Sequence, residues 1–315
     1  MLKEDAPWES MLTRTKAGFL ASLLSIMASI STDAEVPLSR VLQQGVSPYS
    51  ERHSYGANEH QFALRWRPKS EQALDATLVF VHGGCWLSEY DHTHADSVVS
   101  DLAERGFDAW TLEYRRTGRT GGGWPTSLND VIEGVQMIQK ITKAEALRMT
   151  SEARIPSQNT SPTERRPFII MGHSAGGHLA LLAAFNKGPD PEVHTIGLAP
   201  ITHLVAYAEG LNSCQKGTVP FMGGTPGDRP EDYEKATLVN KSFQGFQASV
   251  LQGEADSIVA PSQSRLDGVS TTLVPEAGHF DWLAIGSSAH QALLNELNMI
   301  LKDANTPRQQ DKKHD

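Results

Sequence analysis

Residues 167–181 read PFIIMGHSAGGHLAL, an apolar run, a glycine-rich turn and then apolar residues at helical spacing. Such an order is typical of a buried strand that passes sharply into a helix. Ser174 stands at the centre of the turn, in the pattern Gly-x-Ser-x-Gly formed with Gly172 and Gly176. A turn of this kind lifts a serine hydroxyl clear of the sheet, and glycines are needed where side chains would collide with the adjoining strand and helix. The stretch therefore predicts a nucleophilic serine, with a plain glycine-rich turn as the alternative.

A serine hydroxyl becomes a nucleophile when a base removes its proton and a carboxylate orients that base. Asp256 and His279 each follow a short apolar run further along the chain, in the order serine, acid, histidine. In a parallel sheet the residues that follow the strands meet at one edge. We therefore expect Ser174 as nucleophile, His279 as base and Asp256 as the orienting acid. Glu254 is the alternative acid, but it stands nearer to the end of its strand.

Residues 79–86, VFVHGGCW, contain a second glycine-rich turn after an apolar run. Glycines allow the backbone to approach a substrate closely, and backbone N–H groups can stabilise the negative charge that develops on a carbonyl oxygen. We expect the N–H groups of Gly84 and Cys85 to act in this way together with that of Ala175.

The residues expected to contact substrate are aromatic. Trp86 follows the second turn directly, and Phe221 lies in a later irregular stretch. Cys85 and Cys214 are the two cysteines of the chain, too few for a disulfide framework or a complete cysteine zinc site. Their spacing leaves a single bridge between them open. We expect Cys85 to act through its amide and not as the nucleophile.

Short apolar runs alternate with helical patterns along the chain, which predicts an α/β fold with a mostly parallel sheet and helices on both faces. Residues 201–246 carry little strand pattern and are too long for an ordinary connection, so they are predicted to form a small cap or lid. The chain thus divides into an N-terminal extension (1–45), a catalytic domain (46–302) and a polar tail (303–315).

Taken together, HGGCW (82–86) and GHSAGG (172–177) resemble the motifs of the α/β-hydrolase fold. The resemblance is closest to the branch that contains kynurenine formamidases and hormone-sensitive-lipase-like carboxylesterases, and it covers roughly residues 50–302. It implies the same catalytic triad, a small ester or aryl formamide as substrate, and no cofactor. Cys85 departs from the pattern, since lipase-like relatives carry a third glycine there.

Composition excludes some other classes of function. The net charge of −9 offers no basic face for nucleic acid, and no run reaches the ~18–20 apolar residues of a membrane span. The segment from Met11, MLTRTKAGFLASLLSIMASIS, resembles a signal peptide, although an amphipathic helix fits it as well. We favour a cytoplasmic location over export, and the sequence leaves the oligomeric state open.

Two alternative functions follow from other features. HTHAD (92–96) matches the start of a zinc-hydrolase signature, but Ser97 replaces the histidine that should follow, and His92 and His94 would point to different faces of a helix. We therefore expect no metal. A catalytically inactive hydrolase that serves as a binding protein is disfavoured, because the serine, acid, histidine and second glycine turn are all present.

Overall fold

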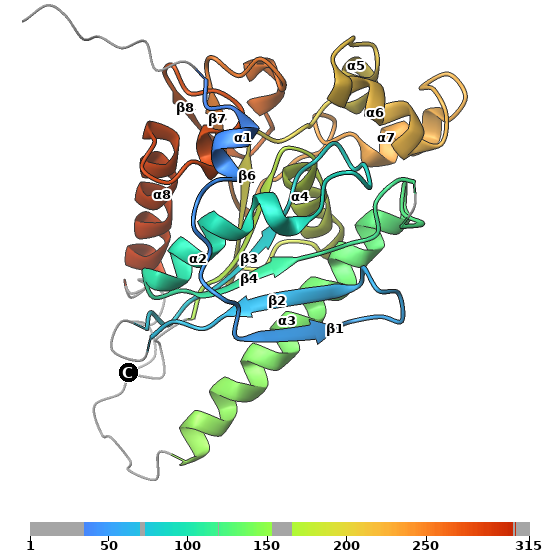
Figure 1. The fold of residues 1–315 in the computed structure, drawn as a ribbon. Coiled ribbons are helices and arrows are strands. Elements are labelled where there is room, and N and C mark those ends of the chain that lie inside the picture. Colours follow the sequence, from blue (N-terminus) through green and yellow to red (C-terminus); the bar gives the residue numbers. More distant parts are fainter. Residues whose placement is uncertain (1–34, 70–72, 119, 153–165, 305, 307–315) are drawn as a thin grey trace, which may run out of the picture. The chain divides into compact units, whose positions relative to one another are not determined.

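The computed structural model describes residues 35–69, 73–118, 120–152, 166–304 and 306, within a compact unit that begins at Glu35 (Figure 1). The strands are β1 (Glu51–Ser54), β2 (Phe62–Trp66), β3 (Thr77–Val81), β4 (Asp108–Leu112), β5 (Phe168–His173), β6 (Val193–Leu198), β7 (Gln247–Gly253) and β8 (Ser270–Val274). The α-helices are α1 (Leu38–Val41), α2 (Asp96–Glu104), α3 (Thr126–Glu152), α4 (Ala175–Lys187), α5 (Leu204–Ala208), α6 (Ser213–Met222), α7 (Pro230–Ala236) and α8 (Ser288–Ala304). Short 3-10 turns are η2 (His92–His94), η3 (Pro261–Ser264) and η4 (Asp281–Leu283).

The described strands form one sheet in the order β1-β2-β4-β3-β5-β6-β7-β8. Strands β1 and β2 are antiparallel to their neighbours, and every pairing from β4 to β8 is parallel. The predicted α/β fold with a mostly parallel sheet is thereby confirmed. The edge strand β1 was not predicted, because its residues ERHS are polar and only alternately covered.

Alternate residues of the central strands enter two separate cores, because successive side chains of a strand point to opposite faces. Val79 and Ile170 pack with apolar residues of α3 and α4, whereas Phe80 and Met171 pack with those of α2 and α8. Helices therefore cover both faces of the sheet, as predicted (Figure 1).

The spacing of apolar residues predicts helices over residues 92–105, 124–141 and about 282–302, and the structure differs from each of these in extent. The helix predicted over 124–141 continues as α3 to Glu152, where the helix-forming residues KAEAL extend it and Glu145 pairs with Arg65 of β2 at 2.7 Å. The helix predicted over 92–105 is divided into η2 and α2. The closing helix starts only at Ser288, because residues before it form η4 and a turn in which Gly286 has a φ of +87°.

Residues 201–246 contain the three short helices α5, α6 and α7, which lie together in gold in Figure 1. Helix α6 is delimited at both ends by its sequence. Asn212 and Gln215 form a reciprocal capping box at its start, and Gly223 ends it in the left-handed conformation.

The first described residues, assigned to the N-terminal extension on the sequence, pack on the same unit as the sheet. Val36 and Val41 are buried in the core that α2 and α8 share. Gln44 donates to the Leu283 carbonyl at 2.7 Å and accepts from the Ile285 N–H. The signal-like run from Met11 and most of the tail after residue 302 lie outside the described residues. No helix in the described part is both long and apolar enough to cross a bilayer.

Candidate active site

Ser174 occupies a strained turn between β5 and α4. Its φ of 56° and ψ of −118° lie in a region that residues other than glycine rarely adopt. A Cβ at Gly172 would collide with the Gly176 carbonyl, and one at Gly176 would collide with the carbonyls of Val81 and His82. The glycine spacing therefore has the steric cause expected from the sequence, and the serine sits at the amino end of a helix.

His279 and Asp256 meet at the same edge of the sheet. The Nδ1–H of His279 donates to Asp256 Oδ2 at 2.8 Å, and both side chains are buried. The other carboxylate oxygen of Asp256 accepts the backbone N–H groups of Ile258 at 2.9 Å and Val259 at 2.7 Å. Asp256 is thus fixed by its own loop and aimed at the imidazole, whereas Glu254 is exposed.

His173 connects the serine turn to the histidine loop. Its Nε2–H donates to the His279 carbonyl at 2.9 Å, and the two rings lie 4.6 Å apart between centroids. Burial, aided by the charge of His279, lowers the pKa of His173 well below its usual range, so this ring stays neutral. In the described part of the chain, no hydrogen bond directly joins Ser174 Oγ to His279 Nε2.

The second glycine turn runs beside the serine. A Cβ on Gly83 would come within 3.3 Å of the Ser174 Cβ. Gly84, Cys85 and Trp86 all have positive φ, at 98°, 56° and 59°. Among the described residues, the backbone N–H groups of Gly84, Cys85 and Ala175 form no hydrogen bond. These are the three donors predicted to bind an oxyanion.

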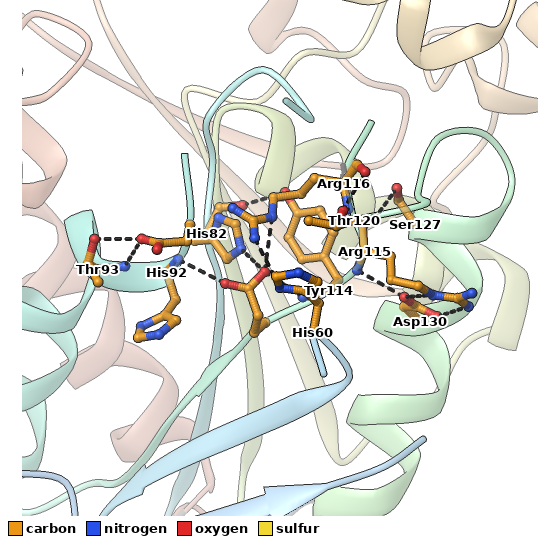
Figure 2. A network of polar contacts seen from close by, with 12 residues as sticks. His60, His82, His92, Thr93, Tyr114, Arg115, Arg116, Thr120, Ser127 and Asp130 are labelled. Atoms are coloured by element: carbon orange, nitrogen blue, oxygen red, sulfur yellow. Dashed lines mark hydrogen bonds and ion pairs between the residues drawn. The ribbon is translucent and has the colours of Figure 1, made fainter. Parts of the chain in front are cut away.

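A buried carboxylate, Glu113, supports this turn through His82 and Arg116, which are labelled in Figure 2. Glu113 pairs with His82 Nε2 at 3.1 Å and with Arg116 Nε at 3.2 Å. It also accepts the backbone N–H groups of Tyr114 and His92. Burial would raise the pKa of Glu113, but the charge and hydrogen bond of His82 and the charge of Arg116 outweigh it and lower the pKa. His82 thus braces the turn through its contact with Glu113.

Trp86 and Phe221, the predicted substrate contacts, pack against each other. Their rings are stacked with centroids 4.6 Å apart and planes 12° apart, and both are buried. His178 lies edge-on to Trp86, and its Nε2–H donates to the Ala236 carbonyl at 2.8 Å. Burial lowers the pKa of His178 to about 4, so it packs as a neutral ring.

Cys85 and Cys214 form a disulfide, which resolves the alternative that the sequence left open. It joins the second glycine turn to α6, across 129 residues of chain. The sequence offered one signal for it, since the two cysteines of the chain lie in or near predicted site segments.

Glu35 is a site-adjacent residue that the sequence did not indicate. One of its carboxylate oxygens accepts the backbone N–H of His279 at 3.0 Å, and the other accepts the Ser257 hydroxyl at 2.8 Å. The next residue, Val36, donates its N–H to Asp281 at 3.1 Å. The segment Glu35–Val36, called the strap below, therefore contacts the loops that carry Asp256 and His279.

The HTHAD segment does not converge on one point. His92 Nδ1 pairs with Asp96 at 2.8 Å, whereas His94 lies edge-on to His82. Across the described ranges, no three His, Cys, Asp or Glu side chains are grouped so that they could hold a metal ion.

Known proteins resemble this chain in sequence and in fold. The BD-FAE family model matches residues 66–267. S-formylglutathione hydrolase of Bos taurus is 25% identical over 218 residues, which cover 64% of this chain and 72% of that protein. The curated relative thus shares part of the chain with modest identity.

Solved structures extend the likeness over the fold. A truncated carbohydrate esterase from gut microbiota has a TM-score of 0.62 and 14% identity, covering 82% of this chain and all of that one. Esterase B of Lactobacillus rhamnosis has a TM-score of 0.62 and 17% identity over 91% and 94% of the two chains. A hormone-sensitive-lipase homologue from a metagenome library has a TM-score of 0.59 and 16% identity over 85% and 91%. The family model covers more than half of the chain, and the parallel sheet agrees with the solved structures, so this chain belongs to the BD-FAE family and has the α/β-hydrolase fold.

Proposed function

We propose that the protein is a serine hydrolase that cleaves a small carboxylic ester or aryl formamide through an acyl-enzyme. His279 takes the proton of Ser174, and the serine oxygen attacks the substrate carbonyl carbon. Asp256 holds the imidazole in the tautomer with Nδ1–H and stabilises the imidazolium that forms. His279 then returns the proton to the leaving group, and water hydrolyses the acyl-enzyme by the same route.

The observation that supports the proposal is that the strained serine turn and the hydrogen-bonded Asp256–His279 pair all follow strands of one parallel sheet, at the same edge. The Asp256–His279 hydrogen bond follows β7 and β8, and the Ser174 turn follows β5. The unpaired amides of Gly84, Cys85 and Ala175 supply donors for the tetrahedral oxyanion. A site with a base, an oriented acid and backbone donors beside one hydroxyl is suited to acyl transfer.

The proposed substrate class rests on the proteins that this chain resembles. The similar proteins act on formylglutathione thioesters or bear the names of esterases, and all of these reactions attack a carbonyl carbon. Trp86 and Phe221 are stacked on each other and buried, so they support the turn that carries Gly84 and Cys85 and present no open face to a substrate. Esters and formamides share the same tetrahedral intermediate, so this machinery serves both.

The first experiment replaces Ser174 by alanine and measures hydrolysis of p-nitrophenyl acetate. We expect turnover to fall by at least ~10³-fold, because the nucleophile is removed. Ser270→Ala, at an exposed position on β8, is the matched control and should keep wild-type turnover. Activity near wild type in Ser174→Ala would contradict the proposal, and loss of activity with a metal chelator would favour the zinc alternative.

The second experiment compares kcat/KM over C2–C12 p-nitrophenyl esters with N-formylkynurenine. A preference for short esters would identify a carboxylesterase, and a preference for the formamide would identify a formamidase. Each difference in kcat/KM can be compared with the effect of one methylene in a pocket, which changes specificity by only ~1–3 kcal/mol.

A further inference from the structure

A disulfide joins the second glycine-rich turn, His82–Trp86, to the segment 201–246. This turn is called the oxyanion turn below. Cys85 lies in the turn and Cys214 is the second residue of α6, with their Cα atoms 5.0 Å apart. Cys85 is half-buried and Cys214 is buried. The chain contains no other cysteine, so this bond has no competing partner.

One face of α6 meets the turn at three successive positions. Three residues after Cys214, Gly217 brings the helix close, since a Cβ there would lie 3.2 Å from the Cys85 carbonyl. Four residues further along, Phe221 stacks on Trp86. The spacing i, i+3, i+7 places all three on one helix face. The disulfide is therefore the covalent part of a continuous contact between α6 and the turn.

The turn needs such a support because of its backbone. Cys85 and Trp86 adopt positive φ without being glycine, which is unfavourable for a residue with a side chain. The amide of Cys85 nevertheless has to point at the substrate oxygen if it is to stabilise charge. The lipase-like part of the resemblance implies a third glycine at position 85, where this chain has a side chain that ends in a covalent link.

We propose that Cys214 is a positioning residue for the oxyanion hole, which holds the amide of Cys85 in place through the disulfide. This inference rests on the proposed function, since it concerns the same amides. Loss of one oxyanion donor typically lowers turnover by ~10²–10³-fold, so even partial misplacement of the turn is measurable.

The same link makes turnover depend on thiol redox state. A dithiol reductant donates two electrons and two protons, the sulfur–sulfur bond breaks, and thiols form at Cys85 and Cys214 while the reductant closes to its own disulfide. Cys85 is the more exposed end of the bond. Reduction releases the turn from α6 without removing any atom of the triad.

The test compares the wild type with Cys214→Ser, both titrated for free thiols. We expect kcat for a p-nitrophenyl ester to fall about 10–100-fold in the variant while KM changes less than about 3-fold. Affinity for a trifluoromethyl ketone, which forms a tetrahedral oxyanion adduct on the serine, should fall in parallel with kcat/KM. A purely structural role would lower the melting temperature and leave both kcat and the affinity for the ketone unchanged in the folded variant.

Reduction of folded wild-type enzyme by dithiothreitol gives a second test that holds even if Cys214→Ser does not fold. Turnover should drop to the level of the variant as two thiols appear, and should return on reoxidation. The double variant Cys85→Ala/Cys214→Ala is the matched control, and dithiothreitol should leave its turnover unchanged. Reduced wild type with undiminished kcat, or Cys214→Ser with wild-type kcat, would overturn the positioning role.

The two proposals can fail separately. Full activity in Ser174→Ala would refute the serine mechanism whatever the cysteine variants do. An inactive Ser174→Ala together with a fully active, fully reduced enzyme would refute the role of Cys214 alone.

Discussion

Gly172 and Gly176 flank the serine at positions that have no room for a methyl group. A Cβ on Gly176 would meet two carbonyl oxygens of the residues that end β3 and begin the oxyanion turn. Because these are backbone atoms, a clash cannot be relieved by a rotamer change. The backbones of the serine turn and the oxyanion turn are thus in close contact at Gly176.

We predict that Gly176→Ala destabilises the fold and separates the two turns. Overpacking of this kind costs about 1–3 kcal/mol, and turnover should fall at least ~10²-fold because the amides move relative to the serine. Gly45→Ala is the control, since a Cβ there would meet nothing within 4 Å. Urea denaturation and ester hydrolysis of both variants measure the effect, and equal behaviour of the two would contradict it.

Glu113 is a buried anion whose four partners all present positive or donor groups. Glu113→Gln removes the charge and turns an N–H₂ group toward donors of His92 or Arg116. We expect the free energy of unfolding to fall by about 3 kcal/mol, as when a buried ion pair loses one member. Exposed Glu89→Gln should change it by less than about 0.5 kcal/mol. Chemical denaturation at pH 7.5 measures the free energy of unfolding of both variants. A Glu113→Gln variant as stable as the wild type would show that the charge is dispensable.

At the scale of single residues, the sequence predicts local geometry where a motif contains its strand, turn and helix in one contiguous stretch. The Gly-x-Ser-x-Gly pattern predicted the position and the steric need around Ser174, because strand, turn and helix are contiguous. Glu113 gave no such signal, since its importance arises from His82 and Arg116 folding around it.

At the scale of elements, the strands of the parallel sheet were predicted because their apolar runs are short and bounded by turn residues. Helix ends were harder to place. Helix α3 continues through polar residues because Glu145 pairs with Arg65 and Arg67, and those partners come from a distant strand. A local pattern contains no information on such a pairing.

The strap at residues 35–36 links the loops that carry Asp256 and His279, which follow different strands. Glu35 holds the His279 backbone and the Ser257 hydroxyl with one carboxylate. Gly278 allows this approach, since a Cβ there would collide with the Glu35 side chain. The strap therefore keeps the base loop and the acid loop in register.

We predict that Glu35→Ala lowers kcat by about 10-fold, because a small displacement of His279 impairs proton transfer. The melting temperature should fall little, since Glu35 is half-buried. Glu35→Gln is the matched control, because an amide can still accept from the His279 N–H and donate to Ser257. Steady-state kinetics on both variants provide the measurement, and an unaltered kcat in Glu35→Ala would exclude a positioning role for the strap.

At the scale of the whole molecule, chain order and parallel pairing were enough to predict that Asp256 meets His279 and that the Ser174 turn follows a strand of the same sheet. Asp256, His279 and Ser174 follow β7, β8 and β5, and a parallel sheet leaves no other edge for them. The cysteine pairing could not be predicted, because it depends on the folded path of residues 201–246, which brings Cys214 of α6 to the oxyanion turn. Topology was thus predictable, and contacts made by irregular segments were not.

Buried histidines should make the whole fold sensitive to mild acid. Burial, with the charge of His82 as a second cause, lowers the pKa of His94 to about 3, and burial lowers that of His178 to about 4. A histidine whose folded pKa is depressed stays neutral in the native state, while the unfolded chain takes up a proton below about pH 6.5. Stability is therefore complete above pH 6.5 and is lost as the pH falls toward the folded values, by about 2 kcal/mol per histidine at pH 5.

We predict that His94→Gln removes one such contribution, since a glutamine does not titrate. Between pH 7.5 and pH 5 the free energy of unfolding should fall by about 2 kcal/mol less in the variant than in the wild type. The window stops at pH 5 because Glu145, whose pKa hydrogen bonding from Arg65 lowers to about 2, begins to contribute below about pH 4.5. Urea titrations at the two pH values measure the difference. Equal losses in both proteins would mean that His94 is not held neutral, and acid sensitivity would then have to come from other buried groups.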